Sequence, residues 1–413
     1  MTKEQDPWFQ SLFAERIGGS GYGKGNEIYK FEKIKRAKRA ALHSHPERRL
    51  LDFGIGENDD MADPLVREVL KCEVDKLENR GYADNGIQAF KDSASSFMRK
   101  AFGVDLDPVT EINHAVGSKP ALAMLPAAFI NPGDIALMTV PGYPVAGTHT
   151  KYYGGEVYKL PLREENGFYP DLASIPADIR RRAKLLVLNY PNSPTGAVAT
   201  PAFYRQVIDF AHTHRIVIVQ DAAHILLSYG AAPLSFLQVE GAKEVGVEVH
   251  SLSKGFNMIG WRMAFVAGHA KIVRAFADVK DNCDSGQFMA IQQAAKTALE
   301  HPEIGDYTRE KYRRRLHKLV AALNQIGFKA RMPGGTYFLY VRAPVASGSQ
   351  SFANAEEASQ FLIQEQSVCC VPWDDAGPYL RFSVTYLARD ESEEDALMAE
   401  TVQRLGRLQF RFI

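Results

Sequence analysis

The stretch SLSKGFNMIGWR, from Ser251 to Arg262, brings together an amine, two hydroxyls and a guanidinium. Lys254 comes just after the apolar run 246–252, so we expect it beyond the end of a buried strand. An amine placed in this way can form a Schiff base when desolvation and cationic neighbours favour its neutral form. Ser251, Ser253 and Arg262 supply hydroxyls and a planar fork of donors that suit a phosphate dianion. The stretch favours a phosphorylated carbonyl cofactor, with an ordinary lysine after a strand as the alternative.

A second set of phosphate-type donors lies in VGSKPALAMLPAAF, residues 116–129. Gly117, Ser118 and Lys119 lead into Pro120, and proline is favoured as the first residue of a helix. Free amides at a helix N-terminus, beside a hydroxyl and an ammonium, can bind an anion. A capped helix without a ligand is the alternative until the fold brings the two donor sets together.

The elements that must position these residues are continuous apolar strands alternating with helices. The runs 135–141, 184–191 and 216–223 read as buried strands, and 201–214 as one of the helices between them. This order indicates a mainly parallel sheet covered on both faces. Ligands of such sheets bind outside the carboxyl ends of the strands. The residues expected there are Tyr143, Asn192, Asp221 and Lys254.

These strand-end residues suit the ring of pyridoxal phosphate. Asp221 can keep the pyridine nitrogen protonated so that the ring accepts electrons, or it can simply cap the next helix. Tyr143 can stack on the ring and Asn192 can donate to its phenolic oxygen, although each also fits an ordinary core or turn position.

Arg381 lies inside the apolar strand 378–386. Its guanidinium can bind an α-carboxylate through two hydrogen bonds, or it can form a structural ion pair.

Composition favours a soluble enzyme. The 413 residues are 46% hydrophobic and 24% charged with a formal net charge of +0, which gives no sign of nucleic acid or a membrane surface as partner. Four cysteines without metal-ligand spacing, two of them the adjacent Cys369 and Cys370, fit a reducing compartment. We read no signal peptide and no transmembrane run. We therefore expect a cytoplasmic protein without a metal.

The chain divides into three expected parts. Residues 1–49, a glycine-rich arm and a basic helix, are expected to pack on the small domain or on a second subunit. Residues 50–305 form the large cofactor-binding domain, and 306–413 a small α+β domain. Further helices are predicted over 31–43, 64–79, 87–102, 307–326, 355–366 and 391–405, and further strands over 50–56, 328–333 and 336–343.

Together these residues resemble the class I/II aminotransferases of fold type I, from about Leu50 to the C-terminus. The most specific element is SLSKGFNMIGWR, supported by PNSPTG at 191–196 in the expected order. The resemblance implies an α/β fold with a seven-stranded, mainly parallel sheet and a smaller α+β domain. It also implies that Lys254 holds pyridoxal phosphate and moves a proton between the substrate and the cofactor. The implied cofactor contacts are Gly117, Ser118, Lys119, Tyr143, Asn192, Asp221, His224, Ser251, Ser253 and Arg262, with Tyr82 lent to the other subunit of a homodimer.

Within this family the chain looks most like the LL-diaminopimelate aminotransferases of lysine biosynthesis. YKFEKI at 29–34, GIG at 54–56 and RGYADNG at 80–86 carry that similarity. It implies substrate contacts from Tyr29, Gly56, Asn192 and Arg381, and a contact of Asp84 with a distal ammonium across the dimer.

Two positions depart from the family pattern. Ser193 stands where the family has asparagine before PTG, so Asn192 is expected to act from one residue upstream. His224 stands where the family has tyrosine, three residues after Asp221. Both positions face the cofactor's phenolic oxygen in the family, so we expect its ionisation to be shifted.

The predicted activity is amino transfer between a small amino acid and a 2-oxo acid, with 2-oxoglutarate as acceptor. A lyase on the same fold, either a C–S β-lyase or a decarboxylase, is the alternative reaction. An aminotransferase for an aromatic amino acid, aspartate or histidinol phosphate is the alternative substrate class. A DNA-binding regulator is disfavoured because the roughly 50 residues before Leu50 are too few and too irregular for a DNA-binding domain.

Overall fold

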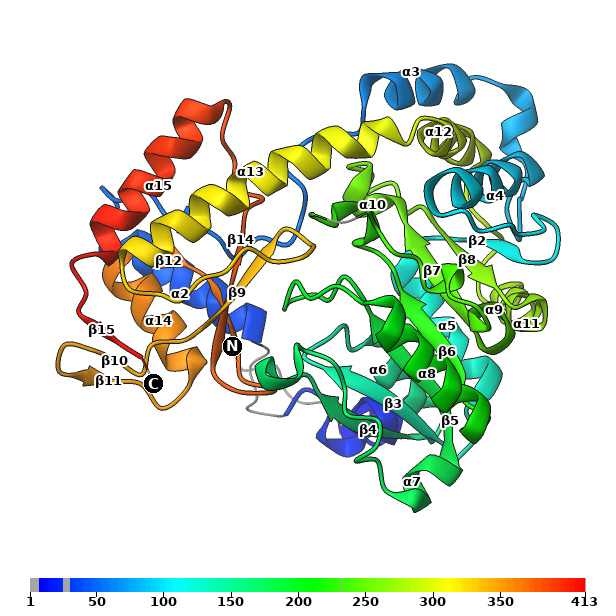
Figure 1. The fold of residues 1–413 in the computed structure, drawn as a ribbon, viewed down its shortest axis with the longest axis horizontal. Coiled ribbons are helices and arrows are strands. Elements are labelled where there is room, and N and C mark those ends of the chain that lie inside the picture. The colour runs from blue at the N-terminus through cyan, green and yellow to red at the C-terminus, as the bar shows by residue number, and fades with distance from the viewer. Residues whose placement is uncertain (1–6, 25–29, 231, 413) are drawn as a thin grey trace.

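The computed structural model describes residues 7–24, 30–230 and 232–412, which form two lobes bridged by the long helix α13 (Glu303–Gln325) (Figure 1). The larger lobe is built around a seven-stranded sheet, and the smaller lobe around three short sheets. Within the described residues, no helix is both long and apolar enough to cross a membrane.

The large sheet has the strand order β2-β8-β7-β6-β5-β3-β4. Every neighbouring pair is parallel except those made by β8, which runs antiparallel to both β2 and β7. The strands are β2 (Ile112–Ala115), β3 (Ile135–Val140), β4 (Glu156–Pro161), β5 (Ala183–Asn189), β6 (Val217–Asp221), β7 (Gly246–Ser251) and β8 (Ala264–Gly268). The predicted α/β fold with a mainly parallel sheet is confirmed.

Both faces of this sheet are covered, so its strands are apolar on both sides. Along β3, Ile135 and Leu137 belong to one core, and Ala136 and Met138 to the core on the opposite face. The first core includes side chains of α4 (Gln88–Phe102), α8 (Pro201–His214) and α12 (Met289–Glu300). The second includes side chains of α5 (Ser118–Phe129), α6 (Val145–Tyr152) and α11 (Ala270–Lys280). The remaining helices of this lobe are α3 (Pro64–Glu73), α7 (Ala177–Arg182), α9 (Ala242–Val245) and α10 (Leu252–Gly255).

The smaller lobe packs its own core around an antiparallel sheet of order β13-β14-β9. Beside it lie a parallel pair, β1 with β12, and the sheet β11-β10-β15. Its strands are β1 (Leu51–Asp52), β9 (Phe338–Arg342), β10 (Ala346–Ser347), β11 (Gln350–Ser351), β12 (Val368–Cys369), β13 (Val371–Trp373), β14 (Tyr379–Ser383) and β15 (Phe410–Arg411). Its helices are α2 (Lys30–Ser44), α14 (Ala355–Gln366) and α15 (Glu391–Leu405), and α1 (Pro7–Gln10) precedes them in the chain.

Local signals explain where several helices begin. Thr200 precedes Pro201 at the start of α8, and its hydroxyl accepts a hydrogen bond from the Phe203 amide. Asp390 and Asn354 cap α15 and α14 in the same way. These residues satisfy amides that the first turn of a helix leaves unpaired, so the predicted starts at 201, 355 and 391 agree with the structure.

Several sequence-based expectations are wrong in detail. Residues 328–333 form no strand, and the strand predicted over 50–56 is reduced to Leu51–Asp52. Because β1 pairs with β12 and Leu51 packs in the small-lobe core, the large domain cannot begin at residue 50. The helix predicted over 64–79 ends at Glu73, and Pro120 is the third residue of α5, not its first.

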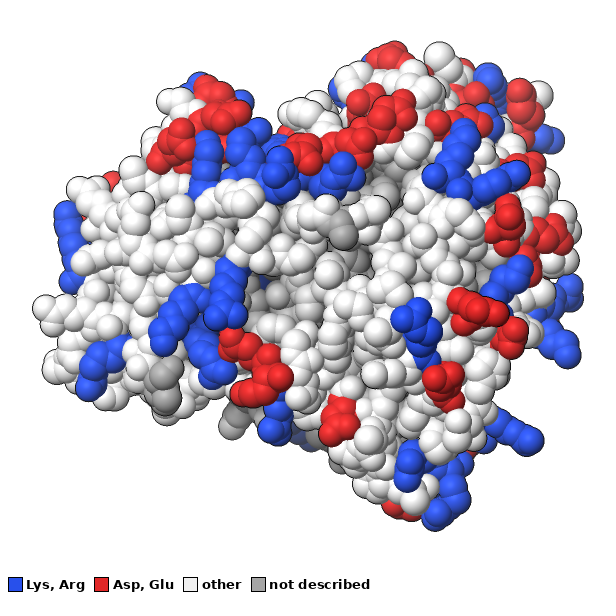
Figure 2. All heavy atoms as spheres, viewed as in Figure 1, with Lys and Arg blue, Asp and Glu red and all other residues white. Residues whose placement is uncertain are grey.

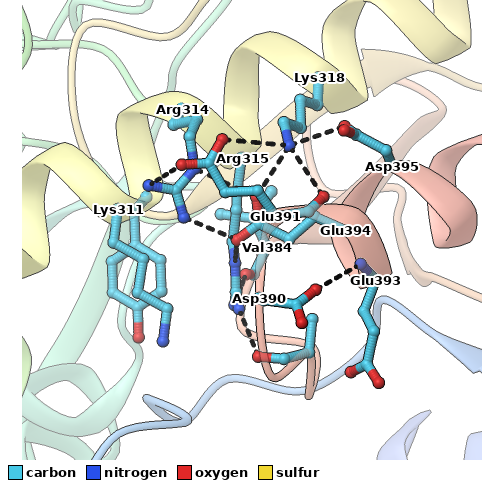
Figure 3. Close-up of polar contacts among 12 residues, drawn as sticks. Lys311, Arg314, Arg315, Lys318, Val384, Asp390, Glu391, Glu393, Glu394 and Asp395 are labelled. Atoms are coloured by element: carbon cyan, nitrogen blue, oxygen red, sulfur yellow. Dashed lines mark hydrogen bonds and ion pairs between the residues drawn. The ribbon is translucent and has the colours of Figure 1, made fainter.

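A buried ionic cluster joins α13 to α15 (Figure 3). It also reaches Asp59, in the segment 53–60 that crosses between the lobes and is called the crossing segment below. Arg315 of α13 is 1% exposed and pairs with Glu394 of α15 at 2.7 Å and with Asp59 at 2.9 Å. Arg314, Lys318 and Lys311 add further ion pairs to these carboxylates. Buried charges are tolerated only with full pairing, so this cluster fixes α15 and residue 59 against α13.

On the side seen in Figure 2, lysine and arginine are interspersed with aspartate and glutamate, most densely along α13 and α15. This agrees with the formal net charge of +0.

Candidate active site

A cleft of about 1530 Å³ opens where strand ends of the large lobe face the small lobe. Its walls include residues that follow β3, β6 and β7, residues of the crossing segment, and residues of β9, β13 and β14. The predicted site residues on the walls are Gly56, Ser118, Lys119, Tyr143, Asp221, His224, Ser251, Ser253, Lys254, Arg262 and Arg381.

Lys254 lies in the short helix α10, directly after β7, with its amine in the cleft. Its Nζ donates to the Gly56 carbonyl at 3.2 Å, and Tyr337 Oη donates to the same carbonyl at 2.8 Å. Asn58 Nδ2 donates to the Lys254 carbonyl at 2.7 Å. The lysine is therefore held at its backbone and its tip by the segment that crosses between the lobes.

The two sets of phosphate-type donors meet in the cleft. Gly117 has φ +85°, and a Cβ there would lie 2.1 Å from Nη2 of Arg262, so only glycine lets the guanidinium reach this turn. Arg262 itself has φ 59°, a conformation that costs free energy and is concentrated at functional sites. Ser118, Lys119, Ser251 and Ser253 line the same region. Hydroxyls, an ammonium and a guanidinium thus line one cleft, and together they make a donor set that suits an anion.

Asp221 closes the far end of β6 as a buried carboxylate, 4% exposed. Burial raises its pKa to about 6, opposed by a hydrogen bond from the Ala223 amide and by the positive charge of Lys254. A carboxylate kept in this state gains free energy from a cationic partner in the cleft.

His224 and Tyr143 flank the same space. His224 is buried, its ring meets Tyr337 edge to face at 5.2 Å, and its Nδ1 has no hydrogen-bond partner among the described residues. Burial, with the charges of Lys254 and Arg381, holds its pKa well below the usual range, so the ring is neutral. Tyr143 follows β3 on the cleft wall and is 41% exposed.

Asn192 does not reach the cleft, contrary to the prediction. Its side chain is fully buried, and its Oδ1 accepts from the Thr195 hydroxyl at 2.7 Å within the turn. Asn189 and Ser193 line the cleft instead. Asn189 is the last residue of β5, where the strand-end rule could have found it.

Arg381 enters the cleft from β14 and is 6% exposed. Its Nη2 donates to the Gly54 carbonyl at 3.3 Å, and its guanidinium lies over the Phe338 ring at 4.1 Å. Its Nε has no hydrogen-bond partner among the described residues. Burial lowers its pKa to about 10, so the side chain is still charged at neutral pH and suits a carboxylate.

Three predicted residues lie elsewhere. Tyr82 is 84% exposed and does not line the cleft of its own chain. Asp84 is also exposed, while its backbone carbonyl accepts from the buried Lys280. Tyr29 lies outside the described residues.

Sequence reasoning missed several residues that shape the cleft: Lys30, Asn58, Asn189, Tyr337, Phe338, Trp373 and Asp375. All of them except Asn189 lie in the small lobe or in the segment 53–60, and no residue pattern along the chain places these segments opposite Lys254.

The profile of the family described as "Aminotransferase class I and II" matches residues 48–395. The chain belongs to this family. It is therefore a transaminase, a class of enzyme whose members depend on pyridoxal phosphate.

Relatives and solved structures agree with this membership. A Methanocaldococcus jannaschii protein named LL-diaminopimelate aminotransferase is 57% identical over 98% of this chain and 100% of its own. One of the same name from Syntrophobacter fumaroxidans is 37% identical, covering 92% and 96%. The substrate-bound BacF structure from Bacillus subtilis has a TM-score of 0.86 at 30% identity, covering 97% of this aminotransferase and 99% of that chain.

The cleft residues of this aminotransferase fit the family's cofactor. The turn at Gly117 accepts the Arg262 guanidinium because it lacks a Cβ, and the hydroxyls and the ammonium that line the same cleft are donors that suit a phosphate. Asp221 offers a buried carboxylate for a protonated ring nitrogen. Lys254 presents an amine to the same cleft.

Proposed function

We propose that this aminotransferase moves an amino group from LL-diaminopimelate to 2-oxoglutarate. The observation that carries the proposal is the 57% identity, over nearly the whole of both chains, to a relative of that name. A relative of the same name from Methanococcus maripaludis is 55% identical over 98% of this chain.

We further propose that the cleft holds pyridoxal phosphate. Ser118, Lys119, Ser251, Ser253 and Arg262 would bind its phosphate, and Asp221 would face its ring nitrogen. When bound, the cofactor supplies a ring that accepts electrons from the substrate's Cα and so acidifies the Cα proton. Asn189 and Ser193, which line the cleft where Asn192 does not, are the candidates for its phenolic oxygen, together with His224.

Lys254 is the residue proposed to carry the cofactor and move the proton. It lines the cleft with Asp221 and Arg381, and its amine has only the Gly56 carbonyl as hydrogen-bond partner among the described residues. The Gly56 carbonyl accepts a hydrogen bond from the amine but carries no charge of its own. No ion pair therefore has to break when the amine exchanges this contact for a substrate.

Arg381 is proposed to fix the substrate's α-carboxylate. Its fork is buried, charged and held by Phe338 and the Gly54 carbonyl, so little side-chain freedom remains to be lost on binding. Fixing that carboxylate sets which face of the substrate meets Lys254.

A homodimer would complete this site. The loop 80–86 holds Tyr82 84% exposed. Lys280 and Asp281 bind Asp84 and Asn85 of this loop, and Gln292 binds the Ile87 amide that follows it. A loop fixed this firmly around an exposed tyrosine suits presentation to a second copy of the chain. We propose that Tyr82 reaches the phosphate of the cofactor bound by that second copy, in the cytoplasm.

The test is a panel of amino donors offered to the cofactor-loaded protein without acceptor. We expect LL-diaminopimelate to convert the bound cofactor to pyridoxamine phosphate, and 2-oxoglutarate to restore it with glutamate as product. Release of ammonia or carbon dioxide instead of stoichiometric pyridoxamine phosphate would favour the lyase and contradict the proposal.

A further inference from the structure

Two cations share one indole ring at the mouth of the cleft. Lys30 Nζ lies 3.7 Å from the centroid of the Trp373 ring, and the Arg381 guanidinium lies 5.5 Å from it. All three side chains line the cleft. An indole attracts a cation without neutralising its charge, so both cations keep their capacity to bind an anion.

Lys30 is placed for a ligand and not for a structural ion pair. It begins α2, and among the described residues it makes no hydrogen bond or ion pair. Burial lowers its pKa, and the negative charge of Asp375 opposes this shift. Lys33, one turn along the same helix, pairs with Glu356 at 2.6 Å. The two lysines of this helix therefore have different contacts: Lys33 joins α2 to α14, and Lys30 faces the cleft.

The adjacent carboxylates Asp374 and Asp375 differ in the same way. Asp374 accepts a hydrogen bond from the Ala355 amide at 2.8 Å and so caps α14. Asp375 lines the cleft, is exposed, and has no side-chain hydrogen bond or ion pair among the described residues. A cation and an anion thus line the same cleft and attract each other, although neither makes a hydrogen bond or ion pair among the described residues.

We propose that Lys30 and Asp375 form a subsite, in the same chain as Lys254, for the far end of the amino donor. Lys30 binds the distal carboxylate and Asp375 the distal ammonium, while Arg381 holds the α-carboxylate. The inference rests on the proposed function, because LL-diaminopimelate carries an ammonium and a carboxylate at both ends.

The two contacts differ in what they select. 2-Oxoglutarate and glutamate carry a distal carboxylate but no distal ammonium, so Lys30 serves both half-reactions. Asp375 serves only the diamino donor. When glutamate or 2-oxoglutarate is bound, Asp375 has no ammonium to pair with. Because Asp375 is exposed to water, these substrates leave no buried charge unpaired.

The experiment measures single-turnover kcat/KM of the cofactor-loaded dimer with LL-diaminopimelate and, separately, with glutamate. Asp375→Asn is expected to lower the value for LL-diaminopimelate about tenfold and to leave glutamate unchanged. Lys30→Met, which keeps the stem on the indole, is expected to lower both values about tenfold or more. Asp374→Asn and Lys33→Gln are the matched controls and should change neither value by more than about twofold.

A binding measurement supplies a readout independent of turnover. Titration calorimetry with pimelate, the seven-carbon dicarboxylate without amino groups, should show about tenfold weaker binding to Lys30→Met and no weakening with Asp375→Asn. Unchanged pimelate affinity in Lys30→Met would overturn the carboxylate half of the proposal. If Asp84→Asn lowers kcat/KM for LL-diaminopimelate alone while Asp375→Asn behaves like wild type, the distal ammonium is bound by the other subunit. That result would overturn the ammonium half of the proposal. If the wild-type enzyme turns over glutamate but rejects LL-diaminopimelate, the proposed function and the ammonium contact fail together, and the pimelate result still decides the role of Lys30.

Discussion

Replacing Asp221 with asparagine should stabilise the cofactor-free protein at alkaline pH while weakening its hold on the cofactor. Asp221 is 4% exposed, and burial raises its pKa from 3.8 to about 6. A folded-state pKa above the unfolded value means that the ionised carboxylate is less favourable in the folded chain. Its contribution to stability is therefore fully present below about pH 4 and lost as the pH rises through 6.

The shift sets the size of the effect. About two pKa units at 1.36 kcal/mol each give a loss of roughly 3 kcal/mol at pH 8. Asparagine keeps an oxygen for the Ala223 amide but carries no charge, so Asp221→Asn should regain most of this amount. The gain should shrink between pH 6 and pH 4, where the wild-type carboxyl becomes protonated in the folded chain.

Urea unfolding of both cofactor-free proteins at pH 8, 6 and 5 measures this difference, with the exposed Asp209→Asn as control. The same variant should bind pyridoxal phosphate at least tenfold more weakly, because the cationic ring nitrogen loses its partner. A variant that is less stable than wild type at pH 8, or a difference that does not depend on pH, would refute the assignment of a buried, electrostatically costly carboxylate.

Three further predictions concern the arginines of the structure. Glu394→Ala leaves Arg315 buried with one carboxylate fewer and should cost about 3 kcal/mol in urea unfolding; a loss below 1 kcal/mol would show that water enters the cluster. Arg381→Lys keeps the charge but loses the fork, so kcat/KM should fall at least tenfold with every amino donor tested; near wild-type values would place the α-carboxylate elsewhere. Gly117→Ala puts a Cβ 2.1 Å from the Arg262 guanidinium at φ +85°, and equilibrium dialysis should show at least tenfold weaker binding of pyridoxal phosphate, whereas unchanged affinity would remove both residues from the phosphate site.

Much of the large lobe could be predicted because its signals are local. Continuous apolar runs gave β3, β5, β6 and β7, and the residues at their ends include Tyr143, Asp221 and Lys254, which line one cleft. Strand β8 was not predicted although AFVAG is as apolar as the parallel strands of the sheet, and nothing along the chain reveals that it runs antiparallel to β2 and β7.

The rest of the site depends on contacts between distant segments. Asn58 binds the Lys254 carbonyl across 196 residues of sequence, and Lys30 reaches Trp373 from the start of α2. Asn192 was misassigned because the sequence shows an amide in a turn without showing which way it points. In the structure Thr195 takes that amide oxygen for the turn itself.

The most direct test of the account is to locate the cofactor on the chain. Protein loaded with pyridoxal phosphate is reduced with borohydride, digested, and mapped by mass spectrometry, with Lys254→Ala treated in parallel. We expect a phosphopyridoxyl group on Lys254 in the wild type and none on any lysine of the variant. A label on Lys119 or Lys30 in place of Lys254, or equal labelling of the variant, would contradict the assignment of Lys254 and the site built around it.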